Sequence, residues 1–297
     1  MRWFIAGALL LVSTHAAGGE PPSVEAGKSL KLLSNNVGIF PAAVVEQYPA
    51  NVREKKKHII ADEEQRAALL AKALMEFDGD PDVVLLQEIW SLPARDRLIK
   101  EMAGEYPHVK HPPAIGDGTT EILASGLMLF SKYPLDDYAF KEFTRGIGID
   151  KQARKGIVGV KLTVGGKQVA VFNTHLQAGG KRDPSVKPHQ LRECDAFIRE
   201  FVDGDPEAIA VMAGDFNIRS NEPEAYGAIF SCLTDARDSY EKELGPLTTT
   251  TRNEKQPDKR IDYLLTFGDV QAASTIVDPA GETISDHMAV FGTVELE

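Results

Sequence analysis

The chain has 297 residues and a formal net charge of −11, from 44 acidic and 33 basic side chains. A protein of this charge is repelled by nucleic acid at long range, so the composition argues against tight non-specific binding of DNA or RNA. The sequence contains no repeat, low-complexity tract or Ser- or Pro-rich linker, which predicts one domain over residues 18–297.

The N-terminus has the pattern of a signal peptide. Arg2 is followed by an apolar run from Trp3 to Val12 and by small and polar residues up to Ala17. The run is too short to span a bilayer, whereas a positive start, an apolar centre and a small-residue end are typical of a secretory signal. We therefore predict a signal peptide over residues 1–17 and a secreted or periplasmic mature protein, whose net charge changes from −11 to −12 when Arg2 is removed.

Apolar, β-branched runs and amphipathic runs follow one another along the chain. The strand-like runs cover residues 30–40, 82–90, 126–132, 156–164, 167–176, 207–218, 260–267 and 287–296. Helical patterns cover residues 62–77, 93–107 and 188–202, the first with Asp62 as its expected N-cap. The Gly165-Gly166 pair predicts a hairpin turn. Several strand-like runs are almost continuously apolar, so we expect mixed sheets with helices on their outer faces.

The two cysteines are open to more than one interpretation. Cys194 shares an amphipathic pattern with Leu191, Ile198 and Phe201, which favours burial as a small apolar side chain. A disulfide to Cys232 is the alternative in an exported protein, because spacing alone does not establish the geometry.

Five of the strand-like runs carry polar residues at an end or a break of the apolar stretch. These residues are Asn36, Glu88, His175, Asp215 with Asn217, and Asp286 with His287. A carboxylate buried at the end of an apolar strand is costly unless it is paired or bound to a cation, so we expect one shared cleft. The Asp286–His287 pair alone has three interpretations: a base with its orienting partner, two metal ligands, or an ordinary polar strand end.

The chemistry of this set favours a hard divalent cation and phosphoryl transfer to water. Carboxylate and amide oxygens dominate, which favours Mg²⁺, Mn²⁺ or Ca²⁺ over Zn²⁺, and the sequence has no HExxH and no paired-cysteine zinc spacing. A metal offsets charge on a phosphate oxygen, a histidine activates water, and amides stabilise the phosphorane. The sequence has neither a GxSxG elbow nor a GxxxxGK[ST] loop, so an activated water is the expected nucleophile.

Six short motifs resemble those of the endonuclease/exonuclease/phosphatase superfamily. In chain order they are SNNV, LLQEIW, NTHLQA, AGDFNI, RIDYLL and SDHMAV, and the resemblance extends from about residue 30 to 295. It implies a DNase I-like α/β fold: a four-layer sandwich in which two packed mixed sheets are flanked by helices.

Within that superfamily the chain is most similar to the bacterial sphingomyelinase C and neutral sphingomyelinase branch. The stretch FTRGIGIDKQARKGIVGVKL is the most informative, because Asp150 and Lys155-Gly156 match that branch's Asp–x4–Lys–Gly element. The resemblance implies that Lys155 approaches the phosphate and that Asp150 gates it. Without the resemblance both residues read as solvated loop charges.

The resemblance also implies the metal site and the base. Glu88 would be the principal Mg²⁺ ligand, with Mn²⁺ or Co²⁺ as substitutes, and Asn36 would contribute to the same metal–phosphate site. His287 would be the general base that activates water, oriented by Asp286.

The remaining motif residues would surround the phosphate. His175 would stabilise the phosphorane or assist the leaving alkoxide. Asp215 and Asn217 would position the phosphate and the base, and Asp262 in RIDYLL would brace the cluster.

Two features depart from the secreted members of the branch. They carry a long aromatic hairpin between the DY strand and the SDH motif, whereas here residues 266–284 contain Phe267 as their sole aromatic. We therefore expect weak or peripheral membrane contact. Leu92 stands four residues after Glu88, where an amide ligand would be expected, so a second metal site at the edge is unsupported.

Two further segments are open to a functional and an ordinary interpretation. Trp90 either touches lipid or packs in the core, and the basic run at residues 53–58 either contacts anionic head groups or is a solvated face.

The implied function is that of an exported Mg²⁺-dependent phosphodiesterase acting on sphingomyelin or a related choline phospholipid. It would release a lipid alcohol and a phosphorylated head group. The alternative is a metal-dependent nuclease or phosphatase of the same fold that acts on DNA or a soluble phosphoester. A non-catalytic binding module is disfavoured because the main catalytic positions are all filled. The expected partner is the phospholipid substrate; nucleic acid is disfavoured and no protein partner is predicted.

Overall fold

The computed structural model describes residues 28–46, 62–113, 125–179, 183–205, 207–252 and 259–296. The predicted signal peptide and the basic run at residues 53–58 lie outside the described residues. None of the helices in the described part of the chain is long and apolar enough to cross a lipid bilayer.

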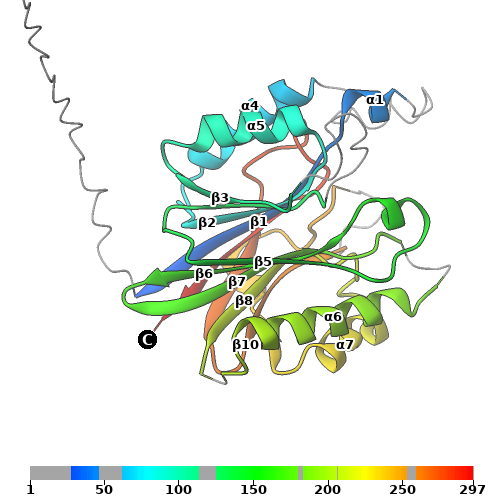
Figure 1. The fold of residues 1–297 in the computed structure, drawn as a ribbon. Helices are drawn as coiled ribbons and strands as arrows, with labels where there is room; N and C mark the ends of the chain where they lie inside the picture. Colours follow the sequence, from blue (N-terminus) through cyan, green and yellow to red (C-terminus); the bar gives the residue numbers. More distant parts are fainter. Residues whose placement is uncertain are drawn as a thin grey trace, which may run out of the picture.

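Two six-stranded sheets form the centre of the molecule (Figure 1). The first sheet contains, in spatial order, β11 (Ala272–Val277), β12 (Ala289–Glu295), β1 (Ser29–Ile39), β2 (Val83–Ile89), β4 (Met128–Ser131) and β3 (His108–Lys110). The second contains β5 (Asp137–Glu142), β6 (Gly156–Val164), β7 (Lys167–His175), β8 (Ile209–Asp215), β10 (Asp262–Phe267) and β9 (Ala236–Asp238). Both sheets are mixed, because β1 pairs with β2 and β7 with β8 in parallel while the other neighbours are antiparallel.

Helices cover the outer face of each sheet, which gives four layers (Figure 1). The first sheet is covered by α4 (Glu63–Met75) and α5 (Leu92–Met102), and the second by α6 (Val186–Phe201) and α7 (Pro223–Cys232). Short helices complete the described elements: α1 (Ala42–Val45), η1 (Gly148–Gln152) and η2 (Lys242–Leu244). The predicted four-layer sandwich is therefore confirmed.

Local sequence explains most of the element boundaries. Asp62 caps α4 by accepting a hydrogen bond from the Gln65 amide at 2.9 Å. Gly165 and Gly166 have φ of 57° and 80°, as a two-residue hairpin turn requires, and they join β6 to β7 as predicted. The second predicted helix ends earlier than expected, at Met102, ahead of the helix breakers at 104 and 107.

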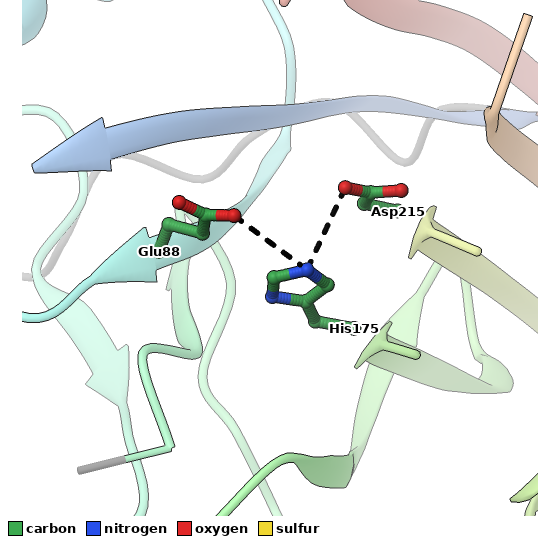
Figure 2. Close-up of side chains that lie close together, drawn as sticks. All are labelled: Glu88, His175 and Asp215. Carbon is green, nitrogen blue, oxygen red and sulfur yellow. Dashed lines mark ion pairs between the residues drawn. The ribbon is translucent and has the colours of Figure 1, made fainter. Parts of the chain in front are cut away.

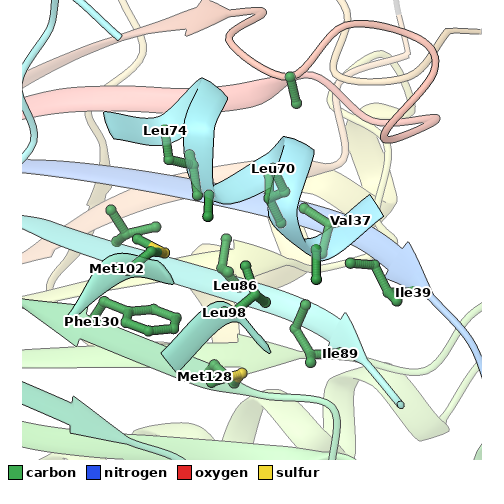
Figure 3. Packing of buried hydrophobic residues seen from close by; sticks show 14 of the residues in the cluster. Val37, Ile39, Leu70, Leu74, Leu86, Ile89, Leu98, Met102, Met128 and Phe130 are labelled. Atoms are coloured by element: carbon green, nitrogen blue, oxygen red, sulfur yellow. The ribbon is translucent and has the colours of Figure 1, made fainter. Parts of the chain in front are cut away.

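The core consists of three apolar clusters. One fills the space between the first sheet and its helices, where Leu70 and Leu74 of α4 and Leu98 of α5 pack near Leu86 of β2 (Figure 3). A second lies between the second sheet and α6 and α7, and a third lies between the two sheets.

Both cysteines belong to the cluster beneath α6 and α7. Cys194 and Cys232 are buried and carry free thiols, so the disulfide alternative does not apply to this structure. Burial raises the pKa of the Cys194 thiol to about 12, which makes it a small apolar core residue at neutral pH.

The sheet topology brings the polar strand ends together. The parallel pairs β1–β2 and β7–β8 present their carboxyl ends at one edge of each sheet. The antiparallel strand β10 begins opposite the end of β8, with Asp262 paired to Asp215. In the same way, β12 starts beside the end of β1, with Ser34 paired to Val290, so the residues just before it reach the same edge.

Candidate active site

Asn36, Glu88, His175 and Asp215 meet in a buried cluster at this edge. His175 Nε2 lies 3.6 Å from Glu88 Oε1 and 3.5 Å from Asp215 Oδ2 (Figure 2). Asn36 Nδ2 donates to Glu88 Oε1 at 3.0 Å and to Asp215 Oδ2 at 2.9 Å. Four strands from two sheets thus supply one polar centre, as the strand-end pattern predicted.

The backbone of this cluster is held in unusual conformations. The β1–β2 register shifts between Asn36 and Ile39, and Glu88 has a φ of 61°, a left-handed conformation that is uncommon outside glycine. Gly214 packs so closely on β7 that a Cβ would lie 1.9 Å from the Thr174 carbonyl oxygen. Strained and closely packed positions of this kind are typical of functional sites.

The residues present fit a divalent cation. Glu88, His175 and Asp215 each offer one ligand atom, and these atoms all lie within 4.8 Å of one another. Among the described residues, the buried Asn36 Oδ1 has no hydrogen-bond partner, as is expected of an oxygen that completes a metal site. Burial raises the pKa of Glu88, and burial with the nearby Asp262 charge raises that of Asp215 to about 6. A cation would compensate the charge of these carboxylates.

Trp90 packs in the core beside the cluster. Its side chain is 5 % exposed, its ring centroid lies 6.3 Å from that of His175, and its Nε1 donates to Glu88 Oε2 at 3.4 Å. Of the two interpretations of this tryptophan, core packing applies, and the indole also restrains the carboxylate of Glu88.

His287 is hydrogen-bonded to Asp262. His287 Nδ1 lies 2.9 Å from Asp262 Oδ2, and the Asp262 side chain is buried at the start of β10. The register of β10 against β8 brings Asp262, which we expected to brace the cluster, to the imidazole. The orienting role of Asp286 stays a prediction.

The charges around His287 hold a proton on its ring. Burial lowers the pKa of His287, but the Asp262 carboxylate, with Asp215 and Asp286, outweighs burial and raises it to about 10. Asp215, Asp262 and His287 form a second group whose ligand-type atoms lie within 4.8 Å of one another. Asp215 therefore belongs to both groups and joins the cation site to the imidazole.

His175 is a neutral imidazole whose Nε2 accepts hydrogen bonds. Lys155 Nζ lies 2.9 Å from His175 Nε2, and Asn217 Nδ2 lies 3.3 Å from the same atom. Burial, together with the positive charges of Lys155 and His287, lowers the pKa of His175 well below its usual value. A neutral Nε2 is an acceptor for these donors, and the role of His175 at the phosphorane or the leaving alkoxide stays a prediction.

Lys155 and Asp150 are in direct contact, while the approach of Lys155 to the phosphate and its gating by Asp150 stay predictions. Lys155 Nζ lies 2.9 Å from Asp150 Oδ2 and also donates to the Leu176 carbonyl at 3.0 Å. With the contact to His175, these three partners match the three N–H donors of the ammonium group. Lys155 therefore reaches the cluster through His175.

Asn217 lies beside the cluster in a constrained conformation. Its φ is 52°, its amide N–H donates to Asp215 Oδ1 at 2.7 Å, and its carbonyl accepts a hydrogen bond from Lys187. Lys187 was missed by the sequence analysis, because an amphipathic helix gives no sign that one of its lysines bends toward a strand end.

The two sheets are also joined just below the cluster by amides that the sequence analysis missed. Gln87 Nε2 donates to Asn173 Oδ1 at 2.8 Å, and Asn173 Nδ2 donates to the Leu86 and Met128 carbonyls, each at 2.9 Å. Both side chains are buried; Gln87 directly precedes Glu88, and Asn173 lies two residues before His175. Both residues lie within the motifs LLQEIW and NTHLQA, and each is a polar residue within an otherwise apolar strand, but neither signal gave them a role.

The chain is similar to known proteins over most of its length. The model of the Endonuclease/Exonuclease/phosphatase family matches residues 51–287. Sphingomyelinase C of Bacillus cereus is 26% identical over 266 residues, which are 82% of this chain and 75% of that protein.

Solved structures show the same fold. The crystal structure of SmcL superposes with a TM-score of 0.68 at 20% identity, covering 89% of this chain and 98% of that one. A mutant of beta toxin from Staphylococcus aureus, with bound magnesium ions, gives a TM-score of 0.65 at 20% identity and covers 89% of this chain and 99% of that one. The chain belongs to the Endonuclease/Exonuclease/phosphatase family and is a phosphoric diester hydrolase.

Proposed function

We propose that the protein is an exported, Mg²⁺-dependent phosphodiesterase that hydrolyses sphingomyelin or a related choline phospholipid. One observation carries the proposal: Asp215 is shared between the group that fits a cation and the His287–Asp262 pair. A phosphate held by the first group would therefore lie next to the imidazole of the second. This juxtaposition suits attack by water on phosphorus.

Different residues of the chain have separate roles in this reaction. His287 accepts a proton from water through Nε2 while its Nδ1 is held by Asp262. Asn36, through its side-chain Nδ2, and Asn217, through its backbone N–H, donate to the two oxygens of the Asp215 carboxylate and hold it between the cation group and His287. A bound Mg²⁺, held by Glu88 and Asp215, would offset the negative charge that develops on the phosphorane.

Three observations support a choline phospholipid as the substrate. The relative with 26% identity is a sphingomyelinase C. The buried Asp150–Lys155 pair touches the cluster through His175, so the element that led to the sphingomyelinase branch is part of the site. The net charge of −11 disfavours a polyanionic substrate such as DNA.

A panel of substrates tests the choice of substrate. The purified protein is incubated with sphingomyelin, phosphatidylcholine, supercoiled plasmid DNA and a soluble phosphomonoester, each with Mg²⁺ and with EDTA. We expect phosphocholine release from sphingomyelin, at least tenfold faster than from the glycerolipid, and intact plasmid. Nicking of the plasmid without phosphocholine release would favour the nuclease alternative.

Asp262→Asn should impair hydrolysis much more than Asp286→Asn. The first variant removes the carboxylate that holds the imidazole of His287, so kcat should fall by up to the ~10⁴ lost when a triad aspartate is replaced by asparagine. The second leaves that hydrogen bond in place, so kcat should fall much less. The measurement is kcat for both variants at saturating Mg²⁺. A larger loss in Asp286→Asn would favour Asp286 as the orienting partner.

Membrane binding should be weak. Residues 266–284 contain the end of β10, a short connection, the strand β11 and a turn, and their sole aromatic, Phe267, is buried in β10, so this segment lacks an apolar surface for insertion. The acidic net charge also opposes adsorption to anionic lipid. We expect faster turnover on detergent-dispersed sphingomyelin than on liposomes, and no co-sedimentation with liposomes in 0.5 M salt. Salt-resistant co-sedimentation would show that another surface inserts.

A further inference from the structure

Arg66 is a buried arginine that contacts the two chain segments on either side of the proposed reaction centre. It lies on α4, and its side chain is 1 % exposed. Its guanidinium donates to the Val37 and Gly38 carbonyls at 2.9 and 3.2 Å, and to the Ile284 carbonyl at 2.5 Å. The first two carbonyls directly follow the metal-site residue Asn36, and the third lies three residues before His287.

The acceptors of Arg66 lie in irregular backbone. Val37 and Gly38 fall in the register shift between β1 and β2, and Gly38 has a φ of 54°. Ile284 precedes β12 and lies between a turn at Gly281 and the isolated antiparallel bridge of His287 with Thr251, so its own carbonyl is outside the sheet. Buried carbonyls outside a ladder need another donor. One guanidinium supplies donors to both segments at once.

Ser285 makes a second link between the same segments. Its hydroxyl donates to the Asn36 carbonyl at 2.5 Å and accepts from the His287 amide at 2.9 Å. An unbroken hydrogen-bonded path therefore runs from the backbone of Asn36 to that of His287. Arg66 lies beside this path and donates hydrogen bonds to the residues that follow Asn36 and to the residue that precedes Ser285.

The negative charge that accompanies Arg66 comes from Asp286. Burial lowers the pKa of Arg66 to about 10, and the Asp286 carboxylate opposes this effect. A buried charged pair is weak evidence for stability, because apolar replacements of similar volume are often as stable. The position of the three acceptors offers a functional reason for an arginine at this site.

The geometry points to Arg66 as a positioning residue that holds the segment of His287 at a fixed distance from the Asn36 end of β1. The inference rests on the proposed function, in which His287 accepts the proton of the attacking water. Misplacement of a reacting group by about 1 Å costs on the order of 10² in rate. Loss of Arg66 should therefore lower kcat far more than it changes KM.

The test compares Arg66→Met and Arg66→Lys with a matched buried arginine. Arg260 is 7 % exposed and its guanidinium contacts Asp238 and three tyrosine rings, away from the carbonyls of the His287 segment. Hydrolysis of dispersed sphingomyelin is measured with Mg²⁺ at a temperature below the Tm of every variant. We expect kcat to fall roughly 10–100-fold in Arg66→Met with KM within about twofold, and less in Arg66→Lys. Arg260→Met should lose stability but keep kcat.

A second measurement does not depend on activity. The Nδ1–H proton that joins His287 to Asp262 should give a low-field NMR resonance, identified by its absence in His287→Ala. We expect this resonance to broaden or vanish in Arg66→Met and to persist in Arg260→Met. If it persists unchanged in Arg66→Met, the positioning role is wrong, whatever the substrate proves to be.

Ser285→Ala covers the case in which Arg66→Met does not fold. The change is small and removes the parallel link, so kcat should again fall with KM nearly constant. Normal kcat in Ser285→Ala together with normal kcat in Arg66→Lys would overturn the inference. A wild-type protein inactive on every phosphodiester would instead contradict the proposed function, and the NMR resonance would still decide the role of Arg66.

Discussion

Replacement of His287 by alanine should lower kcat by ~10²–10⁴, the loss typical of a missing general base. The ring is held at 2.9 Å by Asp262 and lies beside the residues that fit a cation, so its removal affects proton transfer and leaves substrate contacts in place. KM should therefore change little. The measurement is kcat and KM with Mg²⁺, with His108→Ala on the edge strand β3 as a control that should retain both.

The pH dependence should identify the same group. A base must be deprotonated, so kcat of the wild type should rise with pH and reach a plateau above the pKa of His287 in the metal-loaded enzyme. In the metal-free protein this pKa is raised to about 10 by the surrounding carboxylates, and Mg²⁺ should lower it by compensating their charge. NMR titration of the His287 ring with and without Mg²⁺ checks the shift. Near-normal kcat in His287→Ala would show that the Asp286–His287 pair is an ordinary polar strand end.

Removal of divalent metal should abolish activity, and Glu88→Gln should raise the Mg²⁺ concentration needed for half-maximal rate. Glu88 is one of the two carboxylates whose oxygens face the candidate cation position. Replacing a residue that hydrogen-bonds to a metal ligand costs ~10–100-fold in metal affinity or activity. The loss of a direct ligand should therefore cost more. Glu101→Gln, on the surface of α5 in an ion pair with Arg97, is the matched control.

Thermal unfolding gives a readout for the metal site that is independent of activity. Burial raises the pKa of Glu88, and the Asp215 charge adds to this effect, so the carboxylate is unfavourable in the metal-free protein. The Tm of metal-free Glu88→Gln should therefore equal or exceed that of the wild type. Mg²⁺ should raise the Tm of the wild type through linked binding and leave that of the variant almost unchanged. Full activity of the wild type in excess EDTA would contradict the metal assignment.

The meeting of the polar strand ends was predictable from the sequence pattern together with the expected pairing of the strands. An apolar run that ends in a carboxylate or imidazole marks a strand whose end is functional, and parallel pairing then brings the ends of β1, β2, β7 and β8 together. The fold and the meeting of Glu88, His175 and Asp215 follow from these signals and from the motifs.

The partner of His287 was not predictable from its neighbours in sequence. Asp286 is adjacent, but side-chain direction is set by the backbone, and the contact with Asp262 depends on the register of β10 against β8. The contacts of Arg66 were not predictable for a similar reason. It lies four residues before Leu70 on the apolar face of α4, and only the structure shows which carbonyls it meets there.

Hydrolysis of dispersed sphingomyelin in ¹⁸O-labelled water tests the central claim most directly. If a water activated by His287 attacks phosphorus in a Mg²⁺-dependent reaction, mass spectrometry should find one ¹⁸O atom in the released phosphocholine and none in the lipid alcohol. The release should vanish with EDTA and fall at least 10²-fold in His287→Ala. Label in the lipid alcohol, or no phosphocholine release by the wild type with Mg²⁺, would contradict the account.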